Sequence, residues 1–116
     1  MIGIDIENVE RFKNLNQHLT DRVYTKNEIE YCNSRANSHI HFAGIWCAKE
    51  AVVKALTDLN ITVNKIEILH KSDGAPYVNI NEELKQYFKN NKIKNIHISI
   101  SHIDTTATAI AMLERA

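Results

Sequence analysis

The chain has 116 residues, and its 14 basic and 14 acidic side chains leave no net formal charge. This length predicts one domain over residues 1–116, and a hydrophobic content of 44% is enough for a buried core. Balanced charge argues against general nucleic-acid binding, which needs a strong positive field. No apolar run approaches the length of a membrane span, and no signal peptide is evident at the start. The two cysteines form no paired motif, and Cys47 is expected to be an inert core thiol, so we expect a cytoplasmic protein.

The N-terminal segment predicts a strand. Isoleucines alternate with other residues from position 2 to position 7. That period of two is typical of a strand and points Asp5 away from the isoleucines. Asn8 is then expected to cap a short helix over residues 9–15.

Two further helices are expected before the middle of the chain. Thr25 and Glu28 have the spacing of a capping box, which indicates the start of a helix. Ser38 is expected to cap a longer helix that runs to about Leu59, because apolar residues recur there near helical spacing.

The C-terminal half predicts mostly strands. The expected segments are strands at 65–69 and 77–80 around an Asp73-Gly74 turn, a helix at 81–91, and strands at 96–100 and 105–113. The element order β-α-α-α-β-β-α-β-β predicts an α+β fold, with an antiparallel sheet packed against the long central helix.

Three charged side chains and a histidine are candidates for a site that handles phosphate. Asp5 lies within the first strand, whereas Glu50 and Lys54 are four residues apart and project from one side of the long helix. Two carboxylates from separate elements are the minimum protein contribution to a Mg²⁺ site that substrate phosphates and water complete. Lys54 would add a point charge for the same phosphates. His102, which follows Ser101 at the end of a strand, is a candidate donor to a phosphate.

The same residues have simpler interpretations. On pattern alone, Asp5 is more often a strand residue that faces solvent. Glu50 and Lys54 have the spacing of an exposed ion pair, worth about 0.3–0.5 kcal/mol. Lys49 is equally consistent with a solvated lysine, and His102 with a turn residue that has no role. Three glycines in all exclude a phosphate-binding glycine loop, no Gly-x-Ser-x-Gly motif is present, and the histidines lack zinc-ligand spacing.

Basic residues are concentrated near the N-terminus. Between positions 11 and 26, Asp21 is the single acidic residue, and the basic residues are Arg11, Lys13, Arg22 and Lys26. This patch is suited to an acidic protein partner, although a scattered solvated face explains it about as well.

In order and at these separations, four segments resemble the holo-acyl-carrier-protein synthase branch of the 4′-phosphopantetheinyl transferases. The segments are 3–11, 42–55, 73–77 and 99–102. A Lys-Glu-Ala-x-x-Lys element at 49–54, joined to an early Gly-x-Asp and a late Ser-His, is a specific combination. The resemblance covers nearly the whole chain.

The resemblance implies transfer of the 4′-phosphopantetheine arm of coenzyme A to a serine of apo acyl carrier protein, with release of 3′,5′-ADP, for fatty acid biosynthesis. It implies that Asp5 and Glu50 hold Mg²⁺ against the pyrophosphate of coenzyme A and that Lys54 neutralises phosphate charge. It also implies that Ser101 and His102 line the nucleotide pocket.

Further implications concern partners and assembly. Arg11 is expected to face the acidic carrier protein. Small members of the branch are typically trimers with active sites between subunits, so a homotrimer is expected. The chain departs from the branch at Ile45, where arginine is frequent, and at 56–60, where Gly-Thr-Gly is frequent. The candidates to replace the missing charge are Arg35, His39 and His41.

Two alternatives use the same residues. A Mg²⁺-dependent nucleotide phosphohydrolase would release phosphate from a nucleotide through Asp5 and Glu50 without any carrier protein. A non-catalytic trimeric binding module would hold a carrier protein or a nucleotide and turn nothing over.

Overall fold

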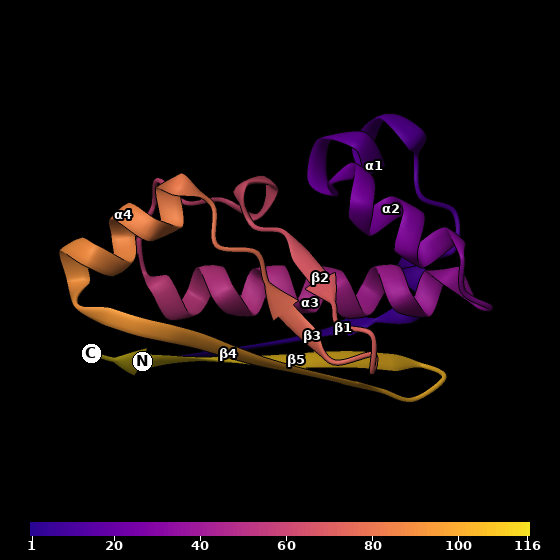
Figure 1. Cartoon of the computed structure of the whole chain (residues 1–116). Helices are drawn as coiled ribbons and strands as arrows, with labels where there is room; N and C mark the ends of the chain where they lie inside the picture. The colour runs from indigo at the N-terminus through magenta and orange to yellow at the C-terminus, as the bar shows by residue number, and fades with distance from the viewer.

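The computed structural model describes residues 1–116, in which a three-stranded sheet lies along one side of a long helix, α3 (Ser38–Leu56) (Figure 1). The sheet is antiparallel and has the order β1 (Ile2–Asn8), β5 (Thr106–Arg115), β4 (Ile93–His102). The α+β fold with an antiparallel sheet against a long helix is therefore confirmed. The two chain ends lie side by side at one end of the sheet (Figure 1).

The remaining elements cover the other side of α3. In chain order they are the 3₁₀ helix η1 (Val9–Phe12), α1 (Gln17–Val23), α2 (Lys26–Asn33), the 3₁₀ helix η2 (Val63–Lys65), the hairpin of β2 (Ile68–His70) and β3 (Pro76–Val78), and α4 (Glu82–Asn91). Helices α1 and α2 lie above one end of α3, and α4 lies near the other (Figure 1).

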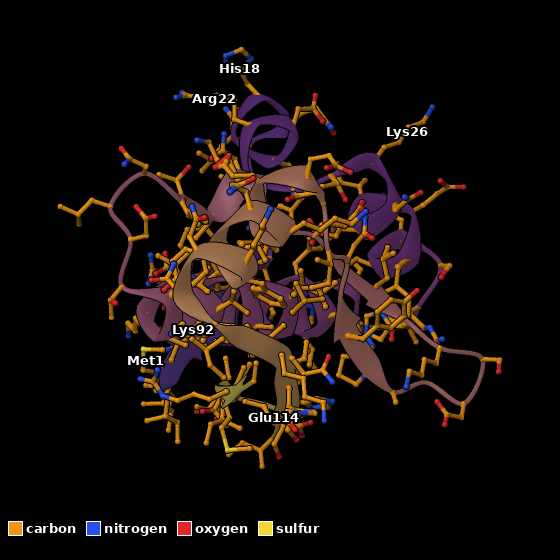
Figure 2. The ribbon with its side chains drawn as sticks, turned by 60° about the vertical axis from the view of Figure 1, so that its left-hand side comes forward. Met1, His18, Arg22, Lys26, Lys92 and Glu114 are labelled. Atoms are coloured by element: carbon orange, nitrogen blue, oxygen red, sulfur yellow. The ribbon has the colours of Figure 1, made fainter.

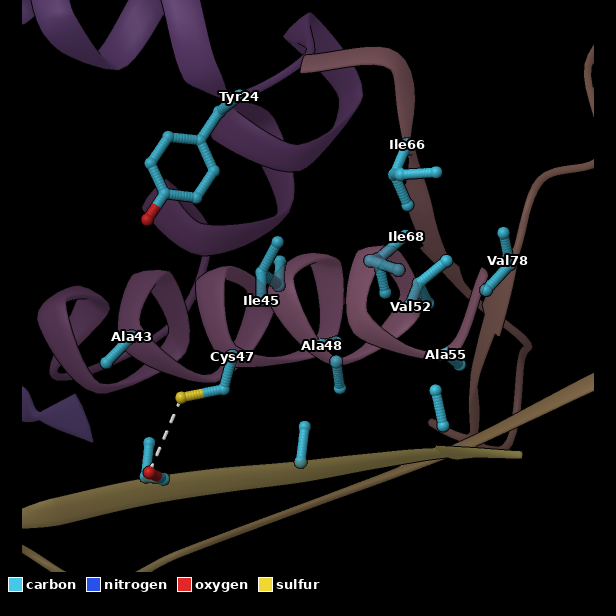
Figure 3. Close-up of a cluster of buried hydrophobic side chains, with 14 of the residues drawn as sticks. Tyr24, Ala43, Ile45, Cys47, Ala48, Val52, Ala55, Ile66, Ile68 and Val78 are labelled. Carbon is cyan, nitrogen blue, oxygen red and sulfur yellow. Dashed lines mark hydrogen bonds between the residues drawn. The ribbon is translucent and has the colours of Figure 1, made fainter. Parts of the chain in front are cut away.

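Small residues let the sheet approach α3 closely. Ala107, Ala109 and Ala111 of β5 are buried against the helix, and Cys47 and Ala48 of α3 point down onto that strand (Figure 3). The thiol of Cys47 donates to the carbonyl of Ala107 at 3.4 Å. Burial, followed by the nearby Asp5 carboxylate, raises the pKa of Cys47 to about 12. Cys47 is thus the inert core thiol that the sequence predicts.

Several predicted boundaries are correct. Thr25 and Glu28 form a capping box at the start of α2. Asn81 caps α4, where its side chain accepts from the backbone of Leu84. The predicted hairpin turn is present, with Gly74 at φ +93°, a backbone conformation that favours glycine.

Other boundaries are wrong. The long helix ends at Leu56 rather than Leu59, because Thr57 takes a left-handed conformation. Its N-cap is Asn37, also left-handed and without a side-chain cap bond, rather than Ser38. The helix expected over 9–15 is only the 3₁₀ turn of η1, although Asn8 does cap it. Helix α1, which Asn16 caps, was not predicted.

The first strand has the predicted alternation, but its apolar side faces outward. Ile2, Ile4 and Ile6 are 63–66% exposed, and Gly3 and Asp5 face α3. Ile2 pairs with Met112 and Ile4 with Ile110 on β5, and those two side chains are also exposed. The outer face of the sheet therefore presents a continuous apolar surface, formed by Ile2, Ile4, Ile6, Ile110 and Met112. None of the helices has the length and apolarity required to cross a membrane.

Candidate functional site

Asp5 and Lys54 meet where β1 passes beneath α3. The ammonium group of Lys54 donates to Asp5 Oδ1 at 3.1 Å and to the carbonyl of Ile4 at 3.0 Å. The Asp5 side chain is 13% exposed, and its second oxygen, Oδ2, is buried with no hydrogen-bond partner. The interpretation of Asp5 as a solvent-facing strand residue is therefore wrong. A buried carboxylate oxygen without a donor is free to coordinate a cation.

Glu50 lies one turn before Lys54 on the same side of α3. Burial, then the negative charge of Asp5, raises the pKa of Glu50, and the positive charge of Lys54 opposes that shift. The salt bridge of Lys54 runs to Asp5, so Glu50 and Lys54 do not form the isolated surface pair that their spacing also permitted. The structure thus brings together Asp5, Glu50 and Lys54, as predicted.

Asp5, Glu50 and Lys54 suit Mg²⁺ better than they suit a metal ion whose ligands are all protein side chains. No cluster of three or more His, Cys, Asp or Glu side chains is arranged to hold a metal ion. Mg²⁺ is usually bound through one or two carboxylates together with water and substrate phosphates. Asp5 and Glu50 are two carboxylates from two elements that would suit such a site, and the Oδ2 atom of Asp5 has no hydrogen-bond partner.

Glu7 and Trp46 also border this group, although neither is among the predicted site residues. Glu7 Oε1 accepts from Arg11 Nη1 at 2.5 Å, and its other oxygen accepts from the indole N–H of Trp46 at 3.2 Å. The charge of Glu7 also helps to raise the pKa of Glu50. The alternation that places Asp5 on the inner side of β1 also places Glu7 there. The sequence pattern therefore contains a signal for Glu7 as a neighbour of Asp5.

We call Asp5, Glu7 and Glu50 the acidic group. Arg11 lies beside it, on a basic side of the molecule. Its side chain is 68% exposed despite the salt bridge to Glu7. An apolar cavity of about 170 Å³ opens next to it, between η1, α1 and Trp46. His18, Arg22 and Lys26 project outward from α1 and α2 (Figure 2).

A second cavity, of about 210 Å³, lies on the other side of α3. Aromatic rings from four elements converge on it: Tyr31 of α2, His41 of α3, His70 of β2 and His102 of β4. Tyr31 and His70 are stacked, with ring centroids 3.7 Å apart, and His41 and His102 lie edge to face at 6.2 Å. The guanidinium carbon of Arg35 lies 4.8 Å from the Tyr31 ring centroid. We call this the imidazole cavity.

The structure separates some residues that the sequence grouped. Ser101 is exposed and pairs with Thr108, whereas His102, the next residue, borders the imidazole cavity. His41 and Glu50 are nine residues apart on α3, which is about two and a half turns, so they project from opposite sides of that helix. Asp5 and His102 lie on the two edge strands of the sheet. The acidic group and the imidazole cavity are therefore separate from each other within one chain.

Comparison with known proteins assigns the family. The sequence profile described as "ACPS: 4′-phosphopantetheinyl transferase superfamily" matches residues 1–111. The chain belongs to this superfamily. It is 42% identical over 117 residues to the holo-[acyl-carrier-protein] synthase of Caldicellulosiruptor saccharolyticus, and the match covers 98% of this chain and 95% of that protein. It is 38% identical over 117 residues to the fatty acid synthase subunit alpha of Candida parapsilosis, but it spans only 6% of that subunit's length.

Solved structures of phosphopantetheinyl transferases share the fold. The holo-[acyl-carrier-protein] synthase of Helicobacter pylori in complex with coenzyme A matches with a TM-score of 0.84 at 28% identity, covering 98% of this chain and all of that one. The Bacillus anthracis enzyme in complex with coenzyme A (3′,5′-ADP) matches with a TM-score of 0.80 at 26% identity, covering 99% and 96%. The predicted membership of the transferase superfamily is thus confirmed.

Proposed function

We propose that this chain is the Mg²⁺-dependent, trimeric form of holo-[acyl-carrier-protein] synthase that the sequence predicts, acting in the cytoplasm in fatty acid biosynthesis. Transfer of the 4′-phosphopantetheine group from coenzyme A to apo acyl carrier protein is the activity of the synthases that it resembles along nearly its full length. The observation that supports the metal most directly is the unpartnered Oδ2 of Asp5 beside Glu50.

The acidic group accounts for the chemistry. Asp5 and Glu50 would hold Mg²⁺, which when bound neutralises charge on the pyrophosphate of coenzyme A. Lys54, half-exposed beside Asp5, would add positive charge for the same phosphates. The carrier serine oxygen bonds to phosphorus as the bond to 3′,5′-ADP breaks. Glu50 is the side chain that we place to accept the serine proton, because its carboxylate lies beside Asp5 at the proposed metal site.

The imidazole cavity is the half-site that we assign to the nucleotide of coenzyme A. Its stacked Tyr31 and His70 rings offer an aromatic surface, and His41 and His102 offer donors for phosphate. Ile45, which stands where arginine is frequent in this branch, lies in the cavity wall. Arg35 lies over the Tyr31 ring but does not line the cavity, so it does not take the place of that arginine in the cavity wall.

A homotrimer would bring the two half-sites together. Since Glu50 and His41 project from opposite sides of α3, a ligand that contacts both half-sites needs a second copy of the chain. The exposed apolar outer face of the sheet offers a surface for that assembly. A cyclic trimer joins unlike surfaces and closes on itself, so three sites form at three subunit boundaries.

The acidic carrier protein would dock on the basic side formed by η1 and α1. Arg11 and Arg22 are exposed there, and the apolar cavity beside Arg11 lies within the same surface. Arg11 also contacts Glu7, so this docking surface lies next to the acidic group.

One experiment tests the proposed function. The purified protein is incubated with coenzyme A, Mg²⁺ and apo acyl carrier protein, and the intact mass of the carrier is measured. A gain of one phosphopantetheine is expected. Asp5→Asn and Glu50→Gln are each expected to reduce the rate by about a thousandfold or more, with unchanged circular dichroism, because charge stabilisation dominates phosphoryl transfer.

Other results would favour the alternatives. Phosphate release from nucleotide without carrier would indicate a phosphohydrolase, and binding without any turnover would indicate a non-catalytic module. If either variant keeps most of the parent rate at saturating Mg²⁺, the carboxylate that it replaces is not a metal ligand.

A further inference from the structure

The wall of the imidazole cavity contains no permanently charged side chain. Ten residues line it, and apart from three histidines they are apolar residues, glycines and Tyr31. The groups in this wall that can become cationic are therefore His41, His70 and His102. An anion that enters the cavity meets cations only if one or more of these rings gains a proton.

The surroundings keep two of the rings deprotonated. Burial lowers the pKa of His41, and His102 of β4, Arg35 after α2 and His39 of α3 add to that effect. Burial also lowers the pKa of His70, and Arg35 and His41 add to it. Every group that acts on these two rings is a cation or another imidazole, and no carboxylate offsets them. Without a bound anion, both rings are neutral at neutral pH.

We propose that the imidazole cavity takes up a proton when it binds the phosphate monoester of a nucleotide, so that His41 and His70 become phosphate-binding cations only together with their ligand. This inference rests on the proposed function for the choice of ligand, and goes beyond it by making nucleotide affinity depend on pH. The geometry supports it: the rings come from three elements and surround one small cavity, into which Arg35 does not reach.

The direction of the pH dependence follows from the signs of the charges. A phosphate dianion within a few ångströms favours the protonated form of an imidazole, so the ligand raises the pKa of each ring that it contacts. Protons are then bound on ligation at any pH between the free and the bound pKa of that ring. By linkage, affinity rises as pH falls through this window, by about tenfold per pH unit at most for each proton taken up.

Isothermal titration calorimetry with 3′,5′-ADP tests the proposal on the intact assembly. Titrations near pH 7.5, in two buffers of different ionisation enthalpy, give the number of protons bound, and the phosphates of the ligand are already mostly dianionic at this pH. We expect uptake of about half a proton or more per site. Adenosine, which has no phosphate, is expected to bind without proton uptake.

Histidine-to-glutamine variants identify the rings. His41→Gln and His70→Gln are each expected to lower the proton uptake and flatten the pH dependence of the Kd. Near pH 8.5 both variants should bind within about threefold of the parent, since an amide and a neutral imidazole each offer an N–H donor. His18→Gln, on the outer surface of α1, is the matched control and should change neither quantity. A merely structural role for either histidine would weaken binding equally at every pH.

Three results would overturn the inference: no proton uptake by the parent, uptake that both variants retain in full, or no binding of 3′,5′-ADP. These outcomes are distinct from failure of the proposed function. If the carrier gains phosphopantetheine while nucleotide affinity ignores pH, the transferase stands and the proton coupling is wrong. If nucleotide binds with proton uptake but the carrier is never modified, the coupling stands and the transferase assignment fails.

Discussion

Lys49 and Glu28 form an ion pair in which neither side chain has any exposed surface. Lys49 Nζ donates to Glu28 Oε1 at 2.6 Å and to the carbonyl of Val23 at 2.7 Å. The other Glu28 oxygen accepts from the backbone of Ile68 at 2.7 Å. Burial lowers the pKa of Lys49, and the Glu28 carboxylate opposes that shift. One buried pair thereby joins the end of α1, the start of α2 and the start of β2 to α3.

Removing one partner of this pair is expected to destabilise the fold strongly. Lys49→Met should lower the free energy of unfolding by about 3–5 kcal/mol, because it leaves the Glu28 charge buried and unpaired. The double variant Lys49→Met/Glu28→Gln should lose clearly less than the sum of the two single losses. Guanidinium unfolding curves measure all four proteins. Additive losses would contradict a direct coupling between the two side chains.

At this scale the sequence predicts residues that local spacing or family resemblance groups together, and misses a distant pair that has neither signal. Glu50 and Lys54 were grouped from their helical spacing, and the structure places both beside Asp5. Lys49 was open to interpretation as a solvated lysine, but it is fully buried. Its partner Glu28 lies 21 residues away, and the local pattern around Lys49 contains no trace of it.

The close approach of β1 to α3 determines where Asp5 lies relative to Glu50. A Cβ atom at Gly3 would lie 1.9 Å from the carbonyl oxygen of Ala51, so only glycine permits this packing. The sheet register then places Asp5 opposite Ala109, on the side that faces the helix. The site therefore depends on a residue that takes no part in its chemistry.

Gly3→Ala is expected to push β1 away from α3. The overlap involves backbone atoms, which cannot rotate aside, so we expect a loss of about 1–3 kcal/mol in stability and a large fall in transfer rate. Gly44→Ala is the comparison for stability alone, because its Cβ would meet only a side-chain carbon of Ile100 at 3.1 Å, whereas Gly44 also lines the imidazole cavity. Thermal unfolding and the carrier mass assay measure both effects. If Gly3→Ala is as stable and as active as the parent, the packing of β1 on α3 is not what positions Asp5.

The basic surface of α1 leads to a separate prediction. Arg22→Glu should raise the KM for carrier protein by roughly tenfold at low salt while leaving the KM for coenzyme A unchanged. The difference should shrink at physiological ionic strength, where screening acts over about 8 Å. Lys89→Glu, near the end of α4, reverses one charge away from this surface and is the matched control. Equal carrier KM values for the two variants would indicate that the carrier docks elsewhere.

Elements with strong local signals were predicted well, and those without them were not. The capping box of α2, the Asp-Gly turn and the alternating strands each have a signature within a few residues. The end of α3 at Leu56 has no such signature, since Thr57 adopts a left-handed conformation in which a β-branched residue is unusual. Helix α1 has only seven residues, and its apolar pattern is too short to stand out.

For the whole molecule, the alternation in the sequence of β1 predicts the period of the strand correctly, but it does not predict which side of the strand is buried. An isoleucine face is normally the inner one, yet Ile2, Ile4 and Ile6 lie on the outer face of the sheet. Residue pattern cannot distinguish a core from a surface that another copy covers. The expectation of a trimer came from family resemblance, and the shared site that it implies stays a prediction.

Mixing two inactive variants tests most directly whether the site is shared between copies. One chain has Asp5→Ala, and the other has His41→Ala with His102→Ala. Each is expected to be inactive alone at limiting coenzyme A, since each lacks one half-site in every copy. Co-expressed with different tags and purified through both tags in turn, they should modify apo carrier protein at about one third of the parent rate, because every mixed trimer has one boundary of three at which an intact acidic group meets an intact imidazole cavity. An inactive mixture of confirmed mixed trimers, or full activity from a 13.3 kDa monomer of the parent, would contradict the shared site.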